Sequence, residues 1–237
     1  MRIRRLIVIA VALLAMCAAV AAASPHPSLD LGLTSARAGA PARIMVGANL
    51  GAAVSGTMMS YEIDLARGFG FDGHAASALC TGRALRRDTC PALSRIGVGS
   101  GRIAVQGPYL PRTEYPITAS LYLSPPRQRG DLAGVLLDLD ENQSALQVAL
   151  PGSVITRPRG RYGLGLRFSD TASELPARYH LTLADLDLDL GSSAYASGRH
   201  HNLFTNPRTC PRGGWPIAVA VRSGYVRRTF TTSTRCF

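Results

Sequence analysis

The feature that most constrains the fold is a short alternation of apolar and polar residues that recurs along the chain. An alternation with a period of two places the apolar side chains on one face of an extended strand. Glycine, proline and serine separate these stretches, and no run of about twelve residues carries the stripe of an amphipathic helix. The sequence therefore predicts an all-β protein with few or no long helices, built as an antiparallel β-sandwich of immunoglobulin-like or jelly-roll-like type. Clear examples are ARIMVGANL, ITASLYLS, ALQVALPG and WPIAVAVRS.

The segment ADLDLDLGSS (184–193) places three aspartates at alternate positions. In a strand, Asp185, Asp187 and Asp189 share one face and the leucines share the other. An EF-hand loop is excluded, because that loop needs glycine at its sixth position, where this sequence has Leu190. We expect a solvated strand face with arginine partners. The alternative is a cation site formed by Asp185, Asp187 and Asp189.

The alternation changes phase near Ala184. Leu181 and Leu183 have the parity of the aspartates that follow them, whereas the later leucines have the opposite parity. A β-bulge, or a strand that leaves one sheet for another, would explain the change.

The N-terminus has the pattern of a secretory signal peptide. Arginines precede an apolar run (6–15), and small residues then lead to an A-x-A site that ends at Ala23. We expect residues 1–23 to be removed. An uncleaved membrane anchor is the alternative, because residues 6–23 are just long enough to span a bilayer. The mature chain, 24–237, is then secreted, either extracellular or associated with the cell envelope, with no transmembrane segment.

Residues 24–237 are long enough for one large β domain, since a chain of this size buries about 70% of its unfolded surface. We expect a single sandwich module. The alternative is two related sub-sandwiches with a boundary near 107–130, because DTCPALSRIG (88–97) and RTCPRGGWPI (208–217) both place T-C-P before a turn and a strand.

Four cysteines remain after residue 23, and an even number in an exported protein indicates disulfides. Of the three possible pairings we favour Cys80–Cys90 and Cys210–Cys236, because each closes a local turn or hairpin. Such loops stabilise a fold by about 3 to 3.5 kcal/mol each in the chain-entropy model. A zinc site does not fit, since the chain has no C-x-x-C pair and no nearby histidines at ligand spacing.

All 26 basic residues are arginine, which codon bias in a high-GC genome explains without any partner. After loss of the first 23 residues, 23 arginines face 15 acidic residues, a net charge of +8. A surplus of that size attracts anionic polymers. The loop RPRGR (157–161) presents Arg157, Arg159 and Arg161 together, and these three residues are the predicted anion-binding site.

No catalytic motif stands out in the sequence. No serine lies in a G-x-S-x-G elbow, and the adjacent His200 and His201 would point to opposite faces of a strand. We therefore expect a non-catalytic module, structural or binding an anionic envelope polymer or glycan, with no cofactor and no nucleic acid. The alternative is a secreted hydrolase whose carboxylate site is unmarked, because 15 acidic residues leave a glycosidase-type pair open.

Two segments, CTGRALRRDTCPALSRIGVGSGRIAV and NPRTCPRGGWPIAVAV with the terminal TRCF, resemble a group of secreted β-rich proteins of high-GC actinobacteria that have no assigned activity. The resemblance covers most of the mature chain. It implies an exported β-rich module with two local disulfides, and it carries over no catalytic residues.

Overall fold

The computed structural model describes residues 28–49, 59–107, 109–141, 147–169, 180–196, 199–223 and 226–237. The predicted signal peptide, 1–23, lies outside these residues. Most of the described chain is β-strand, and its helical turns are short: η2 (Gly73–Ala75), α2 (Gly82–Leu85) and η3 (Ala92–Ser94). None of the helices in the described part of the chain is long and apolar enough to cross a membrane.

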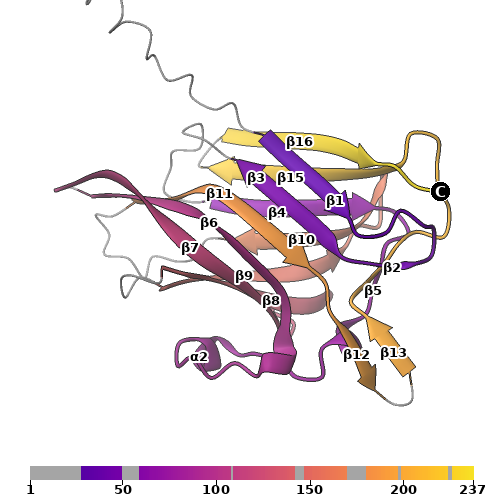
Figure 1. The fold of residues 1–237 in the computed structure, drawn as a ribbon, viewed down its shortest axis with the longest axis horizontal. Helices are drawn as coiled ribbons and strands as arrows, with labels where there is room; N and C mark the ends of the chain where they lie inside the picture. Colours follow the sequence, from indigo (N-terminus) through magenta and orange to yellow (C-terminus); the bar gives the residue numbers. More distant parts are fainter. Residues whose placement is uncertain are drawn as a thin grey trace, which may run out of the picture.

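Within the described residues, eleven strands form one antiparallel sheet that curls into an almost closed cylinder (Figure 1). Strands β6 to β10 follow one another both in the chain and in the sheet, so they form a meander. The order across the sheet is β1 (Ser28–Leu33), β3 (Ile44–Asn49), β11 (His180–Leu190), β6 (Arg95–Gly107), β7 (Leu110–Ser124), β8 (Asp131–Asp140), β9 (Gln147–Thr156), β10 (Tyr162–Ser169), β4 (Met59–Ala66), β15 (Trp215–Ser223) and β16 (Val226–Thr234).

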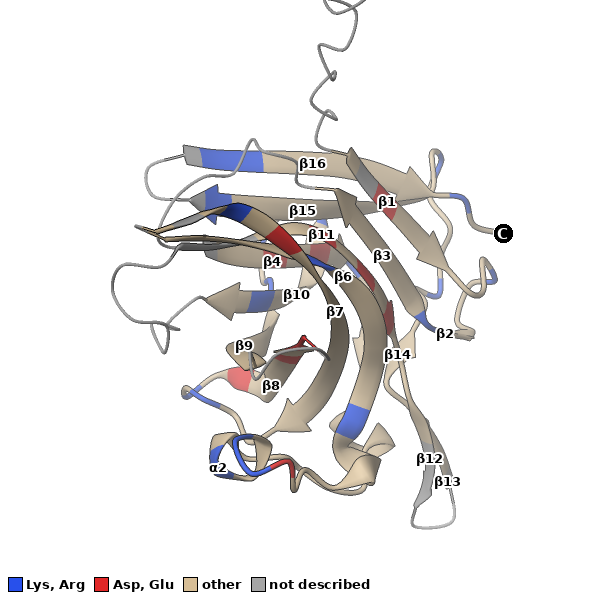
Figure 2. Cartoon of the chain, turned by 60° about the vertical axis from the view of Figure 1, so that its left-hand side comes forward, with Lys and Arg blue, Asp and Glu red and all other residues tan. Residues whose placement is uncertain are grey.

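The prediction of an all-β antiparallel fold is confirmed, and the sheet is barrel-like rather than clearly a sandwich. A sandwich needs two sheets packed face to face, whereas here one sheet bends round until its first and last strands, β1 and β16, lie near each other (Figures 1 and 2). Long twisted strands with bulges produce this bend. Strands β6 and β7, with 13 and 15 residues, are the longest of the described strands, and their pairing shifts register twice.

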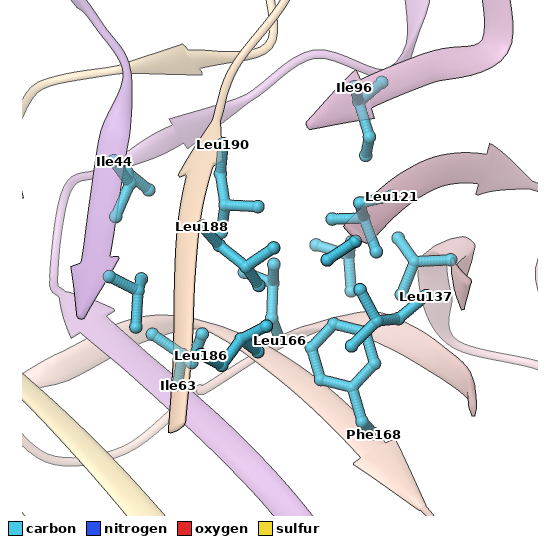
Figure 3. Packing of buried hydrophobic residues seen from close by; sticks show 14 of the residues in the cluster. Ile44, Ile63, Ile96, Leu121, Leu137, Leu166, Phe168, Leu186, Leu188 and Leu190 are labelled. Carbon is cyan, nitrogen blue, oxygen red and sulfur yellow. The ribbon is translucent and has the colours of Figure 1, made fainter. Parts of the chain in front are cut away.

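Apolar side chains from the inner face of the sheet fill the cylinder. Leu186, Leu188 and Leu190 of β11 point inward and meet residues of β3, β4, β7 and β10, including Leu121 and Leu166 (Figure 3). Strands from both sides of residues 107–130 contribute to this single cluster.

The phase change at Ala184 is a β-bulge. In the pairing of β11 with β6 the register shifts between Leu183 and Asp185, which leaves Ala184 as the extra residue. Both Leu183 and Leu186 are buried as a result, because the bulge turns the later part of the strand over.

Two disulfides join the predicted pairs, Cys80–Cys90 and Cys210–Cys236, with sequence separations of 10 and 26 residues. The first holds the α2 segment against the outer face of β8, where Leu85 packs with Leu136. The second ties the loop before β15 to the residues after β16.

Five shorter strands lie outside the large sheet in the described residues. Strands β12 and β13 form a hairpin, and β2, β14 and β5 form a small three-stranded sheet. Their bounds are β2 (Pro41–Ala42), β5 (Gly70–Phe71), β12 (Ser193–Ala196), β13 (Arg199–Asn202) and β14 (Phe204–Thr205).

Glycine at position 99 is required by the close approach of β6 and β11. A Cβ on Gly99 would overlap the backbone carbonyl oxygen of Asp187, and it would lie 2.8 Å from Cδ2 of Leu188. Backbone atoms of a central strand cannot move aside without breaking the ladder.

Gly99→Ala is expected to destabilise the fold by about 3 kcal/mol, as overpacking in a core does. Gly82→Ala is the matched control, because a Cβ there meets nothing closer than Nη1 of Arg86 at 3.7 Å. Urea unfolding of the two variants measures the difference. Equal midpoints for both would contradict the close approach of the two strands.

Candidate functional site

A hollow of about 340 Å³ lies on the outer face of the sheet, across β4, β10, β15 and β16. Basic residues on β10, β15 and β16 are marked in Figure 2. Six of the eight lining residues are charged. The lining consists of Ser60, Glu62, Asp64, Arg157, Arg167, Ala220, Arg222 and Arg227.

Strand β4 supplies the acidic side of the hollow. Ile63 and Leu65 point into the core and are 5% and 0% exposed, so Glu62 and Asp64 must point outward. Their side chains are nevertheless only 15% and 14% exposed, because arginine side chains cover them.

Arg157, which follows β9, neutralises both carboxylates. Its Nη2 contacts Oε1 of Glu62, and its Nε donates a hydrogen bond of 3.0 Å to Oδ1 of Asp64. Arg167 of β10, directly opposite Glu62, adds a contact of 3.4 Å to the same Oε1. A Cβ at Gly165 would lie 3.3 Å from Nε of Arg157, so glycine there leaves room for the guanidinium to cross β10.

Two further arginines face each other at the other end of the hollow. Arg222 of β15 lies opposite Ser60 on one side and Arg227 of β16 on the other. Like charges directly opposite on neighbouring strands repel. Neither Arg222 nor Arg227 forms an ion pair or a hydrogen bond with another residue of the described chain, and both are exposed.

The hollow carries an excess of positive charge, with four guanidinium groups against two carboxylates. Burial raises the pKa of Asp64, although Arg227 and Arg167 oppose that rise. Burial also lowers the pKa of Arg157, and repulsion from Arg167 and Arg227 lowers it further. An anion placed between Arg222 and Arg227 would relieve the repulsion between these arginines.

The predicted anion-binding arginines of the RPRGR loop have different surroundings. Arg157 reaches the hollow, where it already has two carboxylate partners. Arg159 is exposed, and the guanidinium carbon of Arg161 lies 5.0 Å from the ring centroid of Tyr162. That the three arginines act as one site stays a prediction.

The three aspartates of β11 lie on the outer face, as an arginine-partnered strand face requires. Asp185 pairs with Arg102 at 2.5 Å, and Asp189 pairs with Arg43 at 2.8 Å. The carboxylate of Asp187 lies above Gly47 of β3, beside a hollow of about 440 Å³. No group of three or more metal-ligating side chains suited to a metal ion occurs in the described part of the chain.

An Asp–His pair that sequence reasoning missed lies beside η2. Nδ1 of His201 is 2.7 Å from Oδ2 of Asp72, and the rings of His74 and His201 are 5.7 Å apart. Burial tends to raise the pKa of Asp72, but hydrogen bonds from His201 and from the backbone of His74 lower it overall. Among the described residues no serine, threonine or cysteine side chain is hydrogen-bonded to His201, so the pair has no attached nucleophile.

Among the described carboxylates, Asp138 has a strongly raised pKa. Burial raises its pKa to about 6, and the neighbouring carboxylates Asp140 and Asp88 add to the rise, while a hydrogen bond from Gln147 opposes it. Asp138 lines neither of the two hollows described above, and it does not line the hollow of about 370 Å³ beside His74.

Arg157→Met is expected to cost about 2 kcal/mol at pH 7, because Glu62 and Asp64 then stay covered without their main counter-charge. The loss should shrink in acid, since the raised pKa of Asp64 lets that carboxyl become neutral at a pH above its ordinary 3.8. Arg159→Met, at an exposed position, is the control. Chemical unfolding at pH 7 and in acid measures the loss of stability. Equal losses for the two variants at pH 7 would contradict the ion-pair arrangement.

Asp138→Asn should stabilise the protein only above the ordinary pKa of aspartate. A pKa raised from 3.8 to about 6 means that ionisation costs stability progressively across that interval and fully above it. Since the group is half exposed, we expect a gain of only about 1 kcal/mol near pH 8 and none near pH 3.5. The unfolding midpoints of the variant and the parent at the two pH values measure this gain, and Asp30→Asn, at an exposed position, is the control. A gain in stability that persists near pH 3.5 would show that ionisation of Asp138 is not its cause.

Comparison with known proteins gives no assignment. No protein-family model matches the chain, and no curated protein and no solved structure matches it either.

Proposed function

We propose that this chain is an exported, non-catalytic module of the extracellular space or cell envelope, and that it binds an anionic group of an envelope polymer or glycan. The binding site is the hollow between β4, β10, β15 and β16. The observation that carries the proposal is the facing pair of Arg222 and Arg227, two cations on neighbouring strands that form no hydrogen bond or ion pair with a carboxylate of the described chain.

The distribution of charge within the hollow supports an anionic ligand. Arg157 is held by Glu62 and Asp64, so these carboxylates are already neutralised from the β10 side. Arg222 and Arg227 are exposed and form no hydrogen bond or ion pair with another residue of the described chain, so their N–H groups are available to a ligand. Guanidinium forks bind carboxylate and phosphate groups with two parallel hydrogen bonds, which suits either group as the ligand.

The sequence and the covalent structure support export. The N-terminal residues have the signal-peptide pattern, and two disulfides join the four cysteines that follow it. Disulfides persist in oxidising compartments outside the cytosol. The resemblance to secreted proteins of high-GC actinobacteria points the same way. The mature net charge of +8 adds a long-range attraction for anionic polymers.

The hydrolase alternative has less support. The Asp72–His201 pair has no hydroxyl or thiol bonded to it among the described residues, and Asp138 stands apart from the three hollows. Binding without catalysis accounts for the arginine-lined hollow more directly.

Retention of the mature protein on immobilised poly(glycerol phosphate) across a salt series tests the proposal. The double variant Arg222→Gln/Arg227→Gln should elute at lower salt, and the slope of log affinity against log salt should flatten by about 1.5, as for two lost phosphate contacts. The control is Arg127→Gln/Arg129→Gln, which removes the same charge from the exposed loop between β7 and β8.

Equal elution of the two double variants would overturn the proposed site, because only the net charge would then matter. The triple Arg→Gln variant at 157, 159 and 161 tests the loop prediction in the same series. If that variant alone loses retention, the anion binds at the loop and not at the Arg222–Arg227 pair.

A further inference from the structure

We propose that the unit bound in this hollow is a hydroxylated anion, a sugar acid or a polyol phosphate. Its anionic group lies between Arg222 and Arg227, and its hydroxyls donate to Glu62. This inference rests on the proposed function and narrows it to one class of ligand.

The two carboxylates each retain one oxygen without a partner. Both arginine contacts to Glu62 end at Oε1, and the contact to Asp64 ends at Oδ1. Oε2 of Glu62 and Oδ2 of Asp64 therefore have no hydrogen bond to any residue of the described chain. Neither oxygen is among the buried unpaired atoms of the described chain, so both are open to solvent and can accept a hydrogen bond from a ligand hydroxyl.

The hollow is positive at the end near Ser60 and negative further along β4, so the two ends of a ligand meet opposite charges. Arg222 lies opposite Ser60, and Glu62 and Asp64 lie two and four residues further along the strand. That spacing is about 7 and 13 Å. A single sugar-sized unit held at Arg222 reaches Glu62 but not Asp64. A second anionic group on that unit would be repelled by Glu62, whereas a hydroxyl can donate to it. The ligand therefore has one anionic end and a neutral end that donates hydrogen bonds.

The small side chains of β15 leave space in the hollow for the neutral end of such a ligand. Ala220 lies opposite Glu62, and Ala218 lies opposite Asp64, so methyl groups line the strand beside both carboxylates. On the other flank of β4 the space above Gly165 is already taken by Arg157. A volume of about 340 Å³ is at the small end for ligand pockets, which suits a single sugar-sized unit.

Two pairs of ligands test the inference by calorimetry on the mature protein. Glucuronate and cyclohexanecarboxylate share a six-membered ring and one carboxylate, but only glucuronate carries hydroxyls. Glucose 6-phosphate and inorganic phosphate form the corresponding phosphate pair. We expect the hydroxylated member of at least one pair to bind ten or more times as tightly as its partner, and the pair that shows the preference identifies the anionic group.

The variant Ala220→Leu tests the hydroxyl-binding end of the site without changing the anion-binding end. The larger side chain fills the hollow beside Glu62 but leaves Arg222 and Arg227 in place, so it should weaken the hydroxylated ligand at least tenfold and inorganic phosphate less than threefold. Ala92→Leu, on the exposed turn η3, is the control. The calorimetric comparison of the two ligand pairs uses the unaltered mature protein, so it tests the ligand class even if Ala220→Leu fails to fold.

The outcomes distinguish this inference from the function on which it rests. If the bare anions bind as tightly as the hydroxylated ones, the ligand class is wrong and the anion site stands. If the polymer is retained through Arg222 and Arg227 but none of the four small ligands binds, the ligand class is again wrong. If neither polymer nor small ligand depends on Arg222 and Arg227, both proposals fall.

Discussion

Packing of the inward side chains inside the curled sheet sets the direction of every outward side chain. Neighbouring residues of a strand point to opposite faces, so burial of Ile63 and Leu65 places Glu62 and Asp64 outside. A slip of one residue in β4 would bury both carboxylates and expose both aliphatic side chains. The register of the charged hollow is therefore held by the core, because a slip would remove the aliphatic side chains from the core and bury charged groups in their place.

Local patterns predicted the parts of the fold that depend on local physics. The phase change at Ala184 indicated either a bulge or a change of sheet, and the strand contains the bulge. The short cysteine separations favoured the two pairings that the structure has. The curled sheet was missed because alternation shows only that one face of a strand is buried, and not whether a second sheet or the same sheet covers it. That choice depends on accumulated twist and on bulges, such as those in the β6–β7 pairing, which single strands do not reveal.

The candidate site was only partly predictable for the same reason. Arg157 was identified from its loop, but its partner Asp64 lies 93 residues earlier and has no local signature. The His201–Asp72 pair spans 129 residues. Arg222 and Arg227 were within reach of the sequence, since they stand symmetrically about the two residues that separate β15 from β16. Counting cross-strand partners outward from these two residues places the two arginines opposite each other.

The position of β4 has a consequence for folding. It pairs with β10 and β15, which lie far along the chain from it, so during synthesis β4 has both edges open until these strands have been made. Non-local pairing of this kind slows folding, and an open strand edge invites pairing with another molecule. Glu62 and Asp64 carry charge on that open strand and oppose such association. The same two carboxylates thus act as gatekeepers against aggregation before the arginines that later cover them are in place.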